Sequence, residues 1–97
     1  MSKYEVKYSK SFKKDLKLAK RQNKNLDELY KVIGMLANDE ELPEKYQDHY
    51  LHGTYEGYHE CHIEPDFLLV YQIQEDVLVL LLYRLGTHSN LFKKKNA

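Results

Sequence analysis

Histidines are the residues of this sequence with the clearest capacity for chemistry. The 97-residue chain has five, four of them between His49 and His62 and the last at His88. The histidine side chain has an unperturbed pKa of about 6.5, so it can both accept and donate protons near neutral pH. If the fold gathers these side chains, they predict general acid–base catalysis.

Metal-free cleavage of RNA is one reaction that suits these residues. A base must take the proton of a ribose 2′-hydroxyl, an acid must protonate the 5′ leaving oxygen, and a cation must stabilise the phosphorane. Histidines, a carboxylate and an arginine can fill these roles. We expect His62 on a strand, Asp66 in the turn that follows, and Arg84 and His88 at the end of the last strand. A meander would bring these elements side by side, so the four side chains could converge on the open face.

Two other chemistries fit the sequence less well. His49 and His52 are three residues apart, as are His59 and His62, but the second pair falls on a predicted strand and points to opposite faces. We therefore predict no metal site and no cofactor. Cys61 is expected in the core, and the chain contains no glycine-rich phosphate loop and no hydrolase or metalloprotease motif.

Charge is distributed unevenly along the chain, although its formal net value is zero. Residues 1–24 carry nine basic and two acidic side chains, a net of +7, and the remainder carries six and thirteen, a net of −7. Such asymmetry indicates a basic face directed at phosphate, or simply a solvated helix face. The lysines that we consider for RNA contact are Lys10, Lys13, Lys14 and Lys17.

Apolar periodicity predicts an α+β domain. Alternation at residues 4–8 indicates a strand, and helical spacing follows from an N-cap at Ser9 to about Gln22 and from Leu26 to about Ala37. Strands are expected over residues 57–64, 67–73 and 77–85, with turns between them. The order β-α-α-β-β-β predicts an antiparallel sheet with a helical hairpin on one face and an open second face.

The length allows one domain, for which we predict residues 1–92, with a disordered basic tail over 93–97. One cysteine excludes an intrachain disulfide and favours a reducing compartment. No apolar stretch follows Met1, and none is long enough to span a bilayer. We therefore expect a cytoplasmic protein with no membrane partner.

A set of short motifs, in this order, resembles the YafQ-type mRNA interferases of the RelE/ParE superfamily of bacterial toxins. The resemblance runs to Phe92 and rests on Asp48-His49, on His62-Ile63-Glu64-Pro65-Asp66, and on Arg84-Leu85-Gly86-Thr87-His88-Ser89-Asn90-Leu91-Phe92. It implies a RelE-like fold and a cofactor-free toxin that cuts mRNA in the ribosomal A site. It also implies a cognate antitoxin, a small dimeric DNA-binding protein like DinJ.

The same resemblance implies the site residues. His49, His62, Asp66 and His88 correspond to the active site, with His88 as the general acid and the base left open among the other three. Arg84 would hold the scissile phosphate and Phe92 would contact the substrate, either by stacking on a base or by packing on the sheet. His59 stands where an arginine is expected, so it would only partly replace a phosphate contact.

Two alternatives from other functional classes remain open. A ParE-like inhibitor of DNA gyrase would use the same scaffold without catalysis. An inactive binding module would use the histidines for structure. The complete set of histidine, aspartate and arginine side chains favours the nuclease.

Overall fold

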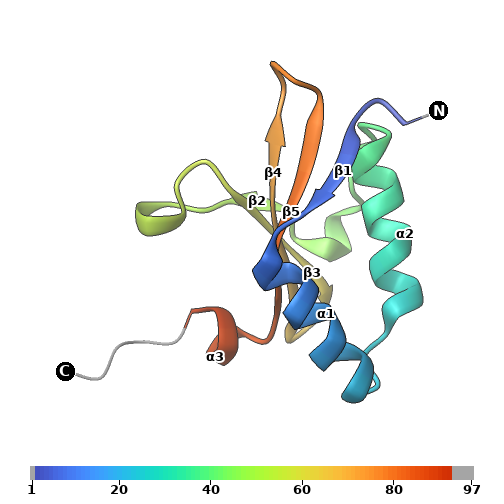
Figure 1. The fold of residues 1–97 in the computed structure, drawn as a ribbon, viewed down its shortest axis with the longest axis vertical. Coiled ribbons are helices and arrows are strands. Elements are labelled where there is room, and N and C mark those ends of the chain that lie inside the picture. Colours follow the sequence, from blue (N-terminus) through green and yellow to red (C-terminus); the bar gives the residue numbers. More distant parts are fainter. Residues whose placement is uncertain (1, 93–97) are drawn as a thin grey trace.

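A twisted five-stranded sheet with two helices against one face forms the body of the protein, as the computed structural model shows for residues 2–92 (Figure 1). The predicted α+β class is confirmed. The basic tail predicted over 93–97 lies outside the described residues. None of the helices within residues 2–92 has the length and apolar character that crossing a membrane requires.

The helical hairpin is built from two capped segments. Helix α1 spans Lys10–Arg21, and the Ser9 hydroxyl accepts a hydrogen bond of 2.9 Å from the Phe12 amide. Helix α2 spans Leu26–Ala37, and the Asn25 side chain accepts one of 3.1 Å from the Glu28 amide. Asn23 between them has a φ of 56°, the left-handed conformation that asparagine tolerates and that ends α1 abruptly.

The sheet has the order β1-β5-β4-β3-β2. Strands β3 (His59–Glu64), β4 (Phe67–Gln74) and β5 (Val79–Gly86) form the predicted antiparallel meander. Between α2 and β3 the chain also forms two 3₁₀ turns, η1 (Glu44–Tyr46) and η2 (Gly53–Tyr55). The short edge strand β2 (His49–Tyr50) lies between them and pairs with β3. A last turn of helix, α3 (His88–Leu91), follows β5.

One strand departs from the expected antiparallel sheet. Strand β1 (Glu5–Tyr8) pairs with β5 in parallel, with Val6 opposite Leu80 and Tyr8 opposite Leu82, so the sheet is mixed. The meander leaves the outer edge of β5 with unpaired backbone groups, and β1 satisfies them. Local alternation fixes which face a side chain occupies but not the direction of the neighbouring strand, so the sequence could not show this.

Both faces of the sheet bury apolar side chains. The main core lies between sheet and hairpin and includes Phe12, Leu29, Cys61 and Tyr71. On the second face, Leu68 and Val70 of β4 are covered by residues of the 51–58 loop and of the 88–92 segment, so this face is less open than expected. The part of the second face beside these segments carries the histidines.

Candidate active site

Three histidines from distant parts of the sequence meet on the second face of the sheet. His62 of β3 lies between the other two, with ring centroids 6.4 Å from His49 of β2 and 5.7 Å from His88 at the start of α3. Pairing of β2 with β3 places His49 opposite Glu60, and the end of β5 carries His88 toward the turn after β3. Imidazoles at these separations can contact one phosphodiester group.

Glu60 is a site residue that our sequence analysis missed. Its side chain is 6% exposed, and one carboxylate oxygen lies 3.3 Å from Nε2 of His49 and 3.4 Å from Nε2 of His62. A buried carboxylate is costly unless it has charged or hydrogen-bonding partners, and these two rings are its partners. The signal was present, because Glu60 alternates onto the same face as His62.

His88 is held by Asp66, which lies in the turn between β3 and β4. One Asp66 oxygen accepts hydrogen bonds from the His88 backbone amide at 3.0 Å and from ring Nδ1 at 3.1 Å. The two bonds, the backbone one foremost, lower the pKa of the Asp66 carboxyl group below its usual value. Because Nδ1 faces a carboxylate, Nε2 is the ring nitrogen that remains for a substrate.

The same cluster has the donor set of a metal site. Glu60, His62 and His88 each offer a ligand atom, and these atoms lie within 4.8 Å of one another. Our prediction of no metal site considered pairs of histidines on single segments, whereas this set comes from β3 and α3. One carboxylate and two imidazoles suit zinc or copper.

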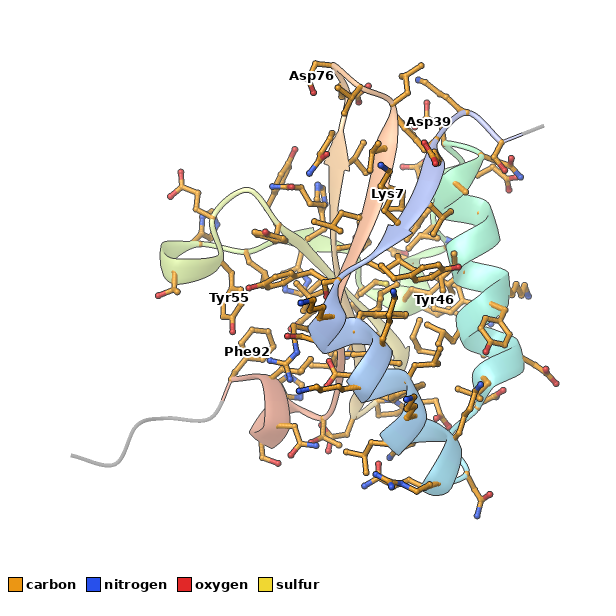
Figure 2. All side chains as sticks on the ribbon, viewed as in Figure 1. Lys7, Asp39, Tyr46, Tyr55, Asp76 and Phe92 are labelled. Atoms are coloured by element: carbon orange, nitrogen blue, oxygen red, sulfur yellow. The ribbon has the colours of Figure 1, made fainter. Side chains whose placement is uncertain are left out.

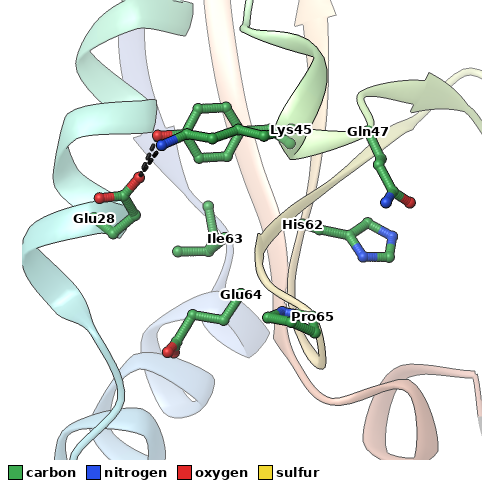
Figure 3. A pocket seen from close by; sticks show the side chains of 8 residues that line it. Glu28, Lys45, Gln47, His62, Ile63, Glu64 and Pro65 are labelled. Atoms are coloured by element: carbon green, nitrogen blue, oxygen red, sulfur yellow. Dashed lines mark hydrogen bonds and ion pairs between the residues drawn. The ribbon is translucent and has the colours of Figure 1, made fainter.

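A pocket of about 330 Å³ opens beside His62, between α2, η1 and the turn after β3. Figure 3 shows Gln47 and His62 on one side of it and Glu28 on the other. Glu28 is held by hydrogen bonding from the Tyr46 hydroxyl and by Lys45, which lies 3.8 Å away. The Glu28 hydrogen bond, together with burial, raises the pKa of Tyr46 to about 12. Tyr46 therefore remains a neutral donor that fixes this wall.

The sequence model of a protein family described as "Bacterial toxin of type II toxin-antitoxin system, YafQ" matches residues 4–93. The chain belongs to the YafQ toxin family. A curated relative, the mRNA interferase toxin YafQ of Escherichia coli, is 37% identical over 89 residues, which cover 91% of this chain and 95% of the relative. The predicted resemblance and the predicted enzyme class, an mRNA interferase, are confirmed.

Solved structures of the YafQ family and its relatives have the same fold. The toxin in the E. coli DinJ-YafQ complex superposes with a TM-score of 0.85 at 36% identity, covering 93% of this chain and 98% of that one. A metal-bound toxin from Helicobacter pylori superposes with a TM-score of 0.86 at 47% identity, covering 95% and 100%.

The side chain of Arg84, the predicted phosphate ligand in this YafQ-family chain, already forms an ion pair within the protein. Its Nε and one terminal nitrogen donate to the Asp15 carboxylate of α1 at 2.8 and 3.2 Å, and the Leu85 amide donates to the same carboxylate at 2.9 Å. The contact joins α1 to β5 across 69 residues of sequence. Arg84 therefore has a structural partner, and only its remaining N–H groups are available to a phosphate.

Replacing Asp15 by alanine is expected to destabilise the protein by about 2–3 kcal/mol, because the half-buried Arg84 and the Leu85 amide lose their acceptor. The free energy of unfolding from urea denaturation measures this. Asp76→Ala, at an exposed turn, is the matched control and should change stability by less than about 1 kcal/mol. Equal stability of the two variants would contradict a structural role for the Asp15–Arg84 pair.

Phe92 lies at the rim of the histidine cluster within a group of aromatic rings. Figure 2 shows it close to Tyr55, and their centroids are 5.4 Å apart in an edge-to-face arrangement. Its ring is also 6.2 Å from that of His88. Both alternatives for Phe92 thus have a basis, because it packs on the second face and remains partly exposed beside His88.

His59 does not join the cluster. It lies on the opposite face of β3, between the rings of Tyr50 and Tyr71 at 4.1 and 5.0 Å, and burial lowers its pKa. The predicted lysines of α1 are exposed on the side of the helix away from the core: Lys10, Lys13, Lys14 and Lys17. Their role in RNA binding, like that of His59, stays a prediction.

Proposed function

We propose that this chain is a ribosome-dependent, metal-independent mRNA endoribonuclease that cuts mRNA in the A site and so inhibits translation. The observation that carries the proposal is the group of three imidazoles, each beside a carboxylate, on one exposed face. Membership of the YafQ family supports the same class of activity, since a curated member is an mRNA interferase.

In the proposed reaction the 2′-oxygen of one nucleotide attacks the adjacent phosphorus, and the 5′-oxygen of the next nucleotide leaves. His88 is the acid: Asp66 holds its Nδ1–H and stabilises the imidazolium, and Nε2–H protonates the leaving oxygen. His62 is the base, because Glu60 lies at its Nε2 and leaves Nδ1 to accept the 2′ proton. The products are a 2′,3′-cyclic phosphate and a 5′-hydroxyl.

His49 is the residue that we propose as the cation for the phosphorane. Its Nδ1 lies 2.7 Å from the Gln47 carbonyl oxygen and its Nε2 lies 3.3 Å from Glu60, so both ring nitrogens face acceptors. A doubly protonated ring satisfies both of these contacts. Its positive charge would then stabilise the negative charge that builds on the phosphate oxygens. Arg84 and Phe92 would contribute phosphate and base contacts from the rim.

The proposed partners are the programmed ribosome and a DinJ-like antitoxin, all in the cytoplasm. The E. coli YafQ protein has been crystallised with DinJ, and the basic face of α1 would complement an acidic antitoxin segment. A ParE-like action on DNA gyrase is not favoured, because the chain belongs to the YafQ family and because gyrase binding would not need paired imidazoles and carboxylates.

Reconstituted translation with primer extension tests the proposed function. Discrete cuts should appear in the A-site codon only when ribosomes are present, and the upstream fragment should end in a 2′,3′-cyclic phosphate. A single 2′-deoxy nucleotide at a mapped site should abolish that cut alone, because the attacking oxygen is missing. Cutting of the 2′-deoxy message, or cutting of free mRNA at the same rate, would overturn the proposal.

A second proposal concerns metal ions, because Glu60, His62 and His88 form a possible ligand set and the H. pylori relative is metal-bound. We propose that Zn²⁺ or Cu²⁺ inhibits this enzyme, since a bound ion occupies the lone pairs that proton transfer needs. Micromolar Zn²⁺ should stop cleavage, and a chelator selective for transition metals should restore it while Mg²⁺ maintains the ribosome. Loss of activity in the chelator alone would contradict metal independence.

A further inference from the structure

The turn between α1 and α2 lies against the turn that carries Asp66. The Asn25 amide donates to the Glu64 carboxylate at 3.4 Å, and the Lys24 ammonium nitrogen is 5.7 Å from the centroid of the Phe67 ring. Glu64 and Phe67 flank Pro65 and Asp66 in sequence, and Asp66 holds His88. Lys24 therefore lies beside the turn that carries Asp66, although the two residues are 42 positions apart in sequence.

Lys24 differs from the other described lysines. Within residues 2–92 it is the one lysine that is half-buried, and every other is exposed. The left-handed conformation of Asn23 turns the chain, and the Lys24 amide bonds the Ala19 carbonyl at 3.1 Å, so its backbone is fixed. The ring of Phe67 supports the ammonium group. The position of this charge is thus restricted in a way that those of the α1 lysines are not.

The charge of Lys24 also acts on the active site. It makes the smallest of the contributions that lower the Asp66 pKa, after the two His88 hydrogen bonds and the Coulombic contribution of His88. Within the described chain its ammonium group forms no ion pair, whereas Arg84 is bound to Asp15. A lysine that is held in place beside the Asp66 turn and has no carboxylate partner is suited to bind an anion from outside the protein.

We propose that Lys24 binds a backbone phosphate of the mRNA on the 3′ side of the scissile bond, beside the turn from which Asp66 holds His88. This inference rests on the proposed function and assigns it a further substrate-binding residue. A phosphate contact of this type positions the message without reading its sequence. Removing the Lys24 charge should therefore weaken binding of the mRNA by the same factor for every codon that is cut. The cleavage rate at saturation should stay near that of the wild type.

The experiment compares wild type, Lys24→Gln, Lys24→Arg and Lys31→Gln. Lys31 is an exposed lysine of α2 to which we assign no role, so it controls for the same loss of charge. Affinity for ribosomes programmed with 2′-deoxy message, which binds but is not cut, is measured across a salt series. Single-turnover rates on the cleavable message are measured at saturation.

Lys24→Gln should weaken binding by about tenfold, and the slope of log affinity against log salt should fall by about one. Lys24→Arg should restore most of the affinity, and Lys31→Gln should match the wild type. An unchanged salt slope would overturn the proposal, whether or not the saturated rate falls, because Lys24 would then act only on Asp66. Failure of the wild type to cut would instead reject the proposed nuclease.

Discussion

Replacing His88 by alanine is expected to slow mRNA cleavage at saturating toxin by about a thousandfold. The imidazole is the group that we propose to protonate the leaving oxygen, and Asp66 keeps its ring oriented through Nδ1. Without it, water must supply the proton. The measurement is the single-turnover rate of A-site cleavage in reconstituted translation, with primer extension to confirm that the remaining cuts fall at the same sites.

The free energy of unfolding of the His88→Ala variant distinguishes a chemical role of His88 from a structural one. The His88 side chain is 55% exposed, so the alanine variant should unfold within about 0.5 kcal/mol of the wild type. His52→Ala is the matched control, because this histidine is exposed and lies outside the cluster. It should cut normally. A His88→Ala protein that still arrests translation at the wild-type rate would remove the acid from our mechanism.

Replacing Glu60 by glutamine is expected to lower the saturated rate by about a hundredfold, the penalty for catalytic groups displaced by about 1 Å. A single carboxylate oxygen orients both His49 and His62, and an amide of the same size cannot attract two imidazoles in the same way. The proposed base and the proposed cation would then both lose their alignment. The same single-turnover assay measures the change.

Binding to 2′-deoxy programmed ribosomes should be nearly unaffected by Glu60→Gln, because the side chain is buried and directed at the histidines. Glu56→Gln, an exposed change of the same chemistry, should cut at the wild-type rate. If Glu60→Gln reduces affinity and leaves the saturated rate intact, Glu60 supports the shape of the surface and does not position the catalytic rings.

Much of the fold could be predicted because its signals are local. Ser9 and Asn25 cap their helices as side chains of these types do, and apolar spacing located α1, α2 and the three strands of the meander. The parallel partner of β1 could not be predicted, since pairing depends on which edge the rest of the sheet leaves open. The same holds for Asp15 and Arg84, whose contact forms only after α1 packs on β5.

The candidate site also contains residues that the sequence could predict and residues that it could not. Alternation along β3 correctly separated His62 from His59 and Cys61, because a strand has a fixed period of two. Glu60 and Lys24 differ from the other described glutamates and lysines in their degree of burial, which the sequence does not show. A glutamate becomes informative when it is enclosed between two imidazoles, and a lysine when it is held over an aromatic ring.

The pairing of β1 with β5 has a consequence for synthesis. Strand β1 is synthesised first but can pair only after β5 has been synthesised, because Glu5 is opposite Val79. Such distant contacts form slowly and only once both partners are free of the exit tunnel. The sheet therefore cannot be completed before β5 has emerged, and His88, which follows β5, can reach His62 only after that point.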